Sequence, residues 1–361
     1  MKTNFIVSKH FLLSSFFSVF LLILASCGRS GDGGGNSEDN TALSNLIINS
    51  EIVGKSASFP DGDGSGTVNF SVSATNATSY KMLIGSETLS STTGKFSYNF
   101  NTPGTNSHDI FVSAYRGDKF ISGKTSVTVY KAPTQLWSDE FNTDGFPNPN
   151  NWGYDTGNNN GWGNNEVQYY TNRQENAYVS NGTLKIVLKK EAYQGFNYTS
   201  ARLLSKGKFS FKYGRVDIRA KLPAGGGTWP ALWMLGDNIS TVGWPACGEI
   251  DIMEHVGNQL NKIYGTLHHP GHSGGNGDGA TINIPNVTTE FHVYSLDWSP
   301  SQIKFYVDNQ LFYTFANSAS LPFNQNFFFI MNIAMGGNFG GAVDPNFNSS
   351  TMEVDYVRVY Q

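Results

Sequence analysis

The segment GEIDIMEHV, residues 248–256, alternates carboxylates with apolar side chains. This period of two residues predicts a β-strand in which Glu249 and Asp251 share one face, while the isoleucines beside them point into the core. Glu254 breaks the alternation, because a regular strand would place the preceding methionine beside Asp251. One extra residue, as a β-bulge at Ile252-Met253, returns Glu254 to the face of the other two acids. We therefore predict a row of three carboxylates on one face of a bulged strand.

The sequence around this strand predicts further strands and no long helix. Between Thr134 and Gln361, runs such as LKIVL (184–188) and IKFYV (303–307) have the composition of strands. No sustained apolar stripe recurs there with the helical period of 3.6 residues. Residues 134–361 therefore predict a large antiparallel β-sandwich or jelly roll.

A smaller all-β domain is predicted before it, over residues 43–132. Alternating runs such as TVNFSV (67–72) and KFSYNF (95–100) are separated by turn clusters such as PDGDG (60–64). Strands at this spacing are typical of an immunoglobulin-like β-sandwich. The segment KAP at 131–133 is the predicted joint between the two domains.

The N-terminus predicts an export signal over residues 1–26. Its apolar run of 15 residues, 11–25, is too short for a typical membrane-spanning helix and suits the hydrophobic part of a signal peptide. The run leads into LASC, which resembles the lipobox of bacterial lipoproteins and implies cleavage before Cys27 and a lipid on its thiol. Residues 27–42, rich in glycine and polar residues, predict a flexible tether. We expect an exported protein, lipid-anchored to the bacterial membrane at the cell surface or in the periplasm. A plain signal peptide with an incidental cysteine is the alternative.

The composition excludes several classes of protein. Only 14% of the 361 residues are charged and 40 are glycine, which argues against a coiled coil or a long-helix bundle. The net charge is −4 and no basic patch dominates, so nucleic acid is not an expected partner. With Cys27 lipidated, Cys247 has no partner for a disulfide, and a large core must stabilise the fold. We expect a monomer.

Neighbouring carboxyl groups, one ionised and one protonated, are the arrangement that glycoside hydrolysis needs. Like charges at this distance raise one another's pKa, so at least one acid should hold a proton near neutral pH. Retaining enzymes place two carboxyl groups about 5–5.5 Å apart, and inverting enzymes about 6.5–9.5 Å apart. Neighbours in the row are about 6.5–7 Å apart at their Cα atoms, and Glu249 and Glu254 are about twice as far apart. The two glutamate side chains would have to lean toward each other above Asp251, so the spacing permits retention without proving it. The pattern alone also permits an exposed polar strand face or a metal site.

Tryptophans stand close to the acids along the chain. GTWPALWML, residues 227–235, places Trp229 and Trp233 four residues apart on a shared face, and Trp244 follows. Indole rings stack on the apolar faces of pyranose sugars, so we expect these residues to contact a glycan; packing in the core is the alternative.

The order of these motifs resembles glycoside hydrolase family 16, most closely its laminarinase (endo-1,3-β-glucanase) branch. GTWPALWML followed by GEIDIME carries the resemblance, which continues through LWSDEF (136–141), YGRVDIRAKLP (213–223) and NIAMGGN (332–338). It covers nearly all of residues 134–361. The resemblance implies a concanavalin-like β-jelly roll with an open cleft on its concave face, a retaining mechanism and no cofactor for catalysis.

The resemblance also implies roles for individual residues. Glu249 is the expected nucleophile and Glu254 the general acid/base, with Asp251 between them as a hydrogen-bond partner of the nucleophile. Further expected cleft residues are Asn165, Arg202, His268 and Asn338. The extra residue in the strand marks the branch that holds laminarinases, agarases, porphyranases and carrageenases, so it narrows the substrate without fixing it.

Two metal interpretations arise from the sequence. The family often carries a structural Ca²⁺ away from the cleft, and Glu140 and Asp355 stand where its ligands are expected, with carboxylate oxygens that suit Ca²⁺. His268, His269 and His272, with Asp278 nearby, suggest another metal site. Their glycine-rich context favours a mobile loop over the cleft rather than a catalytic metal.

The smaller domain resembles the polycystic-kidney-disease (PKD) domain through ATSYKM (77–82) and TPG (102–104), although the WDFGDG-like segment expected of that family is absent. A spacer is the expected role and a carbohydrate-binding module the alternative. For the whole chain we expect a membrane-tethered endo-β-glucanase that cuts 1,3-linked β-glucan. The alternatives are a hydrolase of a marine galactan and a non-catalytic β-glucan-binding surface protein. The neutral or acidic segments beside the acids favour an uncharged glucan over a sulfated galactan.

Overall fold

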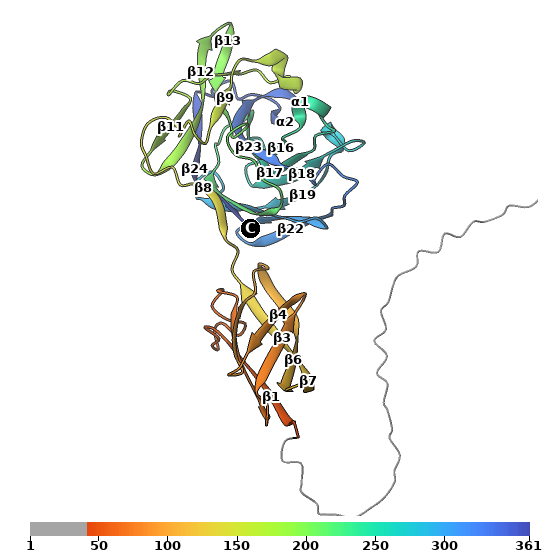
Figure 1. Ribbon diagram of the computed structural model, residues 1–361. Coiled ribbons are helices and arrows are strands. Elements are labelled where there is room, and N and C mark those ends of the chain that lie inside the picture. The colour runs from red at the N-terminus through yellow and green to blue at the C-terminus, as the bar shows by residue number, and fades with distance from the viewer. Residues whose placement is uncertain (1–41) are drawn as a thin grey trace, which may run out of the picture.

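The computed structural model describes residues 42–361 of the chain, and its sheets divide between an N-terminal region and a C-terminal region (Figure 1). The predicted signal peptide, Cys27 and all but the last residue of the predicted tether lie outside the described residues. Among residues 42–361, the structure contains no helix with the length and apolar character needed to cross a membrane.

The N-terminal region, residues 44–131, is a small β-sandwich. A three-stranded sheet with the order β1-β2-β5 and a four-stranded sheet with the order β4-β3-β6-β7 enclose one core, to which Val68 and Phe70 contribute from the first sheet and Met82 and Ile110 from the second. The strands are β1 (Ser44–Ile52), β2 (Thr67–Thr75), β3 (Ser79–Ile84), β4 (Glu87–Ser91), β5 (Lys95–Asn99), β6 (Gly104–Arg116) and β7 (Lys119–Lys131).

The C-terminal region, residues 135–360, consists of two larger sheets packed around a second core. One is ten-stranded, with the path β10-β13-β12-β24-β15-β20-β21-β22 and with β11 and β8 paired to β12 and β24. The other is seven-stranded, with the order β19-β18-β17-β16-β23-β14-β9. Side chains of both sheets form the core, among them Ile218 and Val357 from the first and Ile250 and Met331 from the second. The expected all-β jelly-roll sandwich is confirmed.

The bounds of the elements in this region are as follows. The strands are β8 (Gln135–Asp139), β9 (Gly153–Asp155), β10 (Tyr169–Tyr170), β11 (Ala177–Ser180), β12 (Thr183–Tyr193), β13 (Phe196–Ser200), β14 (Arg202–Leu204), β15 (Gly214–Lys221), β16 (Thr228–Gly236), β17 (Glu249–His255), β18 (Lys262–His268), β19 (Asp278–Asn283), β20 (His292–Trp298), β21 (Gln302–Val307), β22 (Gln310–Ala316), β23 (Phe327–Met335) and β24 (Ser349–Tyr360). The short helices are η1 (Asn159–Gly163), α1 (Ile239–Val242), η2 (Gly274–Asn276) and α2 (Gly337–Gly340).

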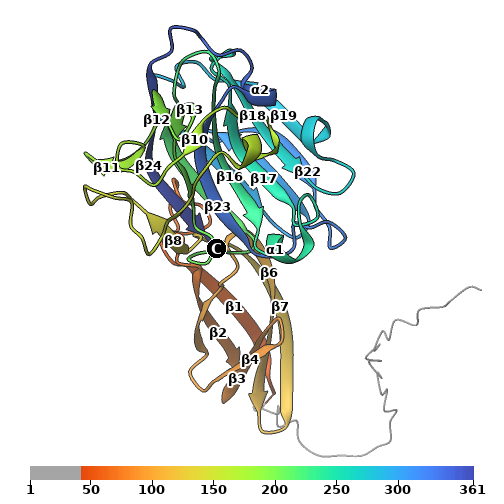
Figure 2. The same cartoon turned by 90° about the horizontal axis from the view of Figure 1, so that it is seen from above.

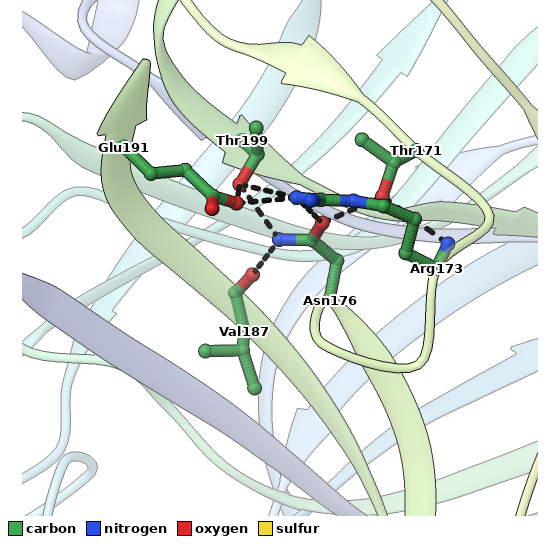
Figure 3. A network of polar contacts seen from close by, with 6 residues as sticks. All are labelled: Thr171, Arg173, Asn176, Val187, Glu191 and Thr199. Atoms are coloured by element: carbon green, nitrogen blue, oxygen red, sulfur yellow. Dashed lines mark hydrogen bonds and ion pairs between the residues drawn. The ribbon is translucent and has the colours of Figure 1, made fainter. Parts of the chain in front are cut away.

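A polar network fixes the turn between β10 and β11 to the neighbouring strands (Figure 3). The Asn176 side-chain amide donates to the Val187 carbonyl at 3.0 Å and to the Thr199 hydroxyl at 3.0 Å. Arg173 pairs with Glu191 and donates to the Asn176 side-chain oxygen at 3.0 Å. Because these groups are largely buried, their mutual satisfaction stabilises the turn and the strand β10 that leads into it.

The predicted bulge is present in β17. Asp251 lies opposite Thr266 of β18, and Glu254 lies opposite Tyr264, so three steps along β17 match two steps along β18. The inserted pair, Ile252-Met253, is fully buried in the core. The two consecutive side chains pointing inward leave Glu254 on the same face as the other acids, as the sequence predicted.

Candidate active site

Four adjacent strands of the seven-stranded sheet, β23, β16, β17 and β18, carry the predicted site (Figure 2). Residues directly opposite each other in an antiparallel pair point to the same face. Glu249 therefore shares its face with His268 of β18, and Glu254 shares it with Ala231 of β16, which in turn lies opposite Asn332 of β23. The register thus gathers polar side chains from several strands around the row of acids.

Glu254 is held by two donors. The Trp229 indole N–H donates to its Oε1 at 2.9 Å, and the Thr266 hydroxyl donates to its Oε2 at 3.4 Å. Each donor comes from a strand that pairs with β17. Glu254 therefore has a fixed direction on the acid face and does not point into the core.

Glu249 and Asp251 have a shared neighbour in His268. The His268 Nε2 lies 3.3 Å from Asp251 Oδ2 and 3.8 Å from Glu249 Oε1. The Trp244 indole N–H donates to Glu249 Oε2 at 2.9 Å. The two glutamates at the ends of the row therefore each accept a hydrogen bond from a tryptophan.

The three acids ionise less readily than free carboxyl groups because of where they lie. The pKa of Glu249 is raised to about 8, chiefly by burial and then by the negative charges of Asp251 and Glu254, while His268 and the Trp244 N–H act in the opposite direction. Burial also raises the pKa of Glu254, and raises that of Asp251 well above its usual range with a further contribution from the charge of Glu254. Solvent reaches 17% of the Glu249 side chain and only 5% of the Asp251 side chain, so burial opposes ionisation less at Glu249 than at Asp251.

The predicted tryptophans line this face, but each also has a second role. Trp229 and Trp233 are both partly exposed on the shared face of β16. The Trp233 indole N–H donates to Asn332 Oδ1 at 2.8 Å, and the guanidinium of Arg202 stands 4.9 Å from the centre of the Trp233 ring. Trp244 is 48% exposed, so its ring face is open to a ligand. The indole N–H groups thus orient rings whose faces remain partly free.

The other expected cleft residues also lie at this face. Arg202 stacks on Trp233 and pairs with Asp155 at 3.1 Å. The Asn165 side-chain amide donates to the Asn338 side-chain oxygen at 2.8 Å, although the two residues are far apart in sequence. Phe339, next to Asn338, packs edge-on against Trp229 with ring centres 5.4 Å apart.

A buried chain of hydrogen bonds lies behind Trp233 and was not predicted from the sequence. The Asn332 side-chain amide donates to the Tyr170 hydroxyl at 3.0 Å, and that hydroxyl donates to Glu166 Oε2 at 3.1 Å. Burial raises the pKa of Glu166, and Gln168 donates to the same oxygen at 2.6 Å. Asn332 could have been found as the one polar residue in the apolar run FFFIMNIAM of β23. Thr266 could have been found from its position two residues before His268 on the same strand.

The carboxylates expected to bind calcium have arginine partners in the structure. Glu140 accepts hydrogen bonds from Arg358 at 3.0 and 2.8 Å, and Asp355 pairs with Arg219. The charge of each acid is thereby neutralised within the protein, and Ca²⁺ would have to compete with these arginines. These side chains do not fit a preformed calcium site, and calcium binding stays a prediction.

Comparison with known proteins agrees with this geometry. The model of glycosyl hydrolases family 16 matches residues 164–358. The beta-glucanase of Rhodothermus marinus is 49% identical over 242 residues, which cover 63% of this chain and 84% of the relative. Glucan endo-1,3-beta-glucosidase A1 of Niallia circulans is 41% identical over 257 residues, which cover 63% of this chain and 37% of that protein. The crystal structure of the Rhodothermus marinus laminarinase superposes with a TM-score of 0.61 at 46% identity, over 63% of this chain and 97% of that one. Because the family match spans more than half of the chain and includes the row of acids, this chain belongs to glycosyl hydrolase family 16.

Proposed function

We propose that this protein is a retaining, endo-acting glycoside hydrolase that cleaves 1,3-linked β-glucan of the laminarin type. The observation that carries the proposal is the bulged row itself, in which Glu249 and Glu254 project from one face with Asp251 between them. Family membership and the names of the relatives support both the reaction and the linkage.

The row supplies the groups for a double displacement. Glu249, as carboxylate, attacks the anomeric carbon while Glu254 gives its proton to the departing glycosidic oxygen, and a glycosyl-enzyme forms. Glu254 then takes a proton from water, which attacks the same carbon and releases Glu249 with retained configuration. His268 and the Trp244 N–H favour the anion of Glu249, as the nucleophile requires. Asp251, between the two, is proposed to set the order in which protons leave the row.

The cleft suits an uncharged polysaccharide. Arg202, the cation stacked on Trp233, already pairs with Asp155. A sulfated galactan would need basic side chains free to pair with sulfate, so this pairing favours a neutral glucan. The presence of both glutamates favours an enzyme over a binding protein.

We also propose that the protein is exported and held at the membrane through a lipid on Cys27, and that residues 43–132 and 134–361 are two separate domains. The N-terminal sandwich would act as a PKD-like spacer between the anchor and the hydrolase. The separate cores of the two regions support this division.

The substrate assignment predicts the order of activity on four polysaccharides. We expect the release of reducing sugar to be highest from laminarin and lower from lichenan, with agarose and carrageenan uncut. Proton NMR of the first product should show the β-anomer. Release from agarose or carrageenan alone would favour the galactan alternative, and binding without release would favour the non-catalytic one.

The nucleophile assignment predicts the behaviour of Glu249→Gln. Gln keeps the shape of the side chain and can still accept from Trp244, but it cannot form the glycosyl-enzyme, so we expect a loss of turnover of roughly 10³-fold or more with laminarin binding retained. Glu290→Gln, at an exposed glutamate, is the matched control and should keep wild-type turnover. Unchanged product formation by Glu249→Gln would refute the assignment.

The raised pKa of Glu249 predicts a pH-dependent gain in stability for the same variant. The folded protein holds a proton that the unfolded chain releases above pH 4.5, so its stability falls as the pH rises from about 5 to about 8. The glutamine side chain has no proton to lose. The free energy of unfolding of Glu249→Gln, relative to that of the wild type, should therefore rise by up to about 1.4 kcal/mol per pH unit. Asp251, Glu254 and His268 face this position and are the same in both proteins. Thermal unfolding at pH 5, 6, 7 and 8 measures the difference, and a constant difference would contradict the explanation.

The anchor predicts the location of Cys27→Ser. Without an acylated thiol the protein should move from the membrane fraction to the soluble fraction when cells are fractionated. Cys247→Ala, which removes the buried thiol of the C-terminal region, is the control and should leave the protein with the membrane. Membrane retention of Cys27→Ser would argue against the lipid anchor.

A further inference from the structure

The chain makes a tight turn immediately after β18. His269 and His272 exchange backbone hydrogen bonds of 2.8 and 2.9 Å across Pro270 and Gly271. Gly271 has a φ of +84°, and proline followed by glycine at this φ is the signature of a type II turn. The turn places the two imidazole rings side by side, with centres 4.7 Å apart and planes inclined by 20°.

A carboxylate from the neighbouring strand closes the cluster. Asp278 is the first residue of β19 and lies opposite Leu267, two residues before the turn begins at His269. Its Oδ2 is 2.9 Å from His269 Nε2, and its Oδ1 is 3.1 Å from His272 Nδ1. Two ring nitrogens and a carboxylate oxygen thus lie within 4.8 Å of one another, in a backbone frame fixed by the turn and by strand pairing.

This cluster is distinct from the row of acids. Consecutive residues of a strand point to opposite faces, so His268 faces Glu249 and Asp251 while His269 turns away from them. The His269 ring packs instead against Phe315 and Phe323, with ring centres 5.9 and 5.8 Å away. His269 is buried, whereas the His272 side chain is 49% exposed and opens the cluster to solvent.

We propose that His269, His272 and Asp278 bind a divalent transition-metal ion of the Zn²⁺ type. Two imidazoles and one carboxylate suit such an ion, whereas Ca²⁺ and Mg²⁺ prefer oxygen ligands throughout. Ligand atoms about 2.0–2.2 Å from Zn²⁺ in a tetrahedral site stand roughly 3.3 Å from one another. The nitrogen–oxygen separations of 2.9 and 3.1 Å are close to that value, so small movements would admit the ion. The solvent-exposed side of His272 leaves the fourth position to water.

The ion would cross-link two segments at the edge of the seven-stranded sheet. β19 is the outermost strand of that sheet and pairs with β18 alone within it. Joining Asp278 to the turn closes the loop that contains η2 and adds a connection between β18 and β19 beyond their backbone hydrogen bonds. Bound metal therefore stabilises the folded state by mass action, without entering the cleft.

Metal binding by the full chain after treatment with EDTA tests the proposal. We expect isothermal titration with Zn²⁺ to show one ion per chain and a Zn²⁺-dependent rise in the unfolding temperature. His272→Ala and Asp278→Asn should each weaken binding by about tenfold or more. His292→Ala is the matched control and should bind Zn²⁺ like the wild type. It removes a histidine of β20 that pairs with Asp308. Neither His272→Ala nor Asp278→Asn should change hydrolysis of laminarin in EDTA, because neither side chain touches the acids.

Three outcomes would overturn the proposal. The first is an absence of Zn²⁺ binding at millimolar concentration. The second is binding that survives both His272→Ala and Asp278→Asn. The third is binding abolished by Glu249→Gln and retained in His272→Ala, which would place the ion among Glu249, Asp251 and His268 instead. The test measures binding and unfolding, so it stands apart from the proposed hydrolase activity.

Discussion

Three carboxyl groups on one face of β17 repel one another and have lost most of their contact with water. Both effects raise their pKa values and oppose ionisation, so the surrounding sheet must hold them in place. The indole N–H groups of Trp229 and Trp244 do so at the two ends of the row. The fully buried Ile252 and Met253, directly behind the acids, anchor the strand in the core. The arrangement stores unfavourable electrostatic free energy at the point where the chemistry needs a shared proton.

Much of this arrangement could be predicted from local sequence because side chains of a regular strand alternate with a period of two residues. Counting residues from Glu249 to Glu254 was sufficient to predict the bulge, and counting from Trp229 to Trp233 was sufficient to place both rings on one face. The all-β class followed from the same period in two long stretches of chain. Agreement between local pattern and global fold is what a well-specified sequence provides.

The hydrogen-bond partners of these residues could not be predicted. The alternation along a strand fixes the face on which a side chain lies, but it does not determine which residues of the neighbouring strand lie opposite. Thr266 reaches Glu254, and Asn332 reaches Trp233, only through the register of β18 and β23 against their neighbours. The pairing of Asn165 with Asn338 joins segments at opposite ends of the region. The arginine partners of Glu140 and Asp355, the two acids predicted to bind calcium, could not be predicted for the same reason.

The bulge has a consequence for how this strand can change over generations. Its extra residue is one of two consecutive inward-pointing side chains, so losing Met253 alone would leave the order Glu, Ile, Asp, Ile, Glu with strict alternation. All three acids would still face outward, and the loss would fall on core volume rather than on the row. The deletion of one codon therefore separates the bulged strand from a regular one, and the three acids share a face in both.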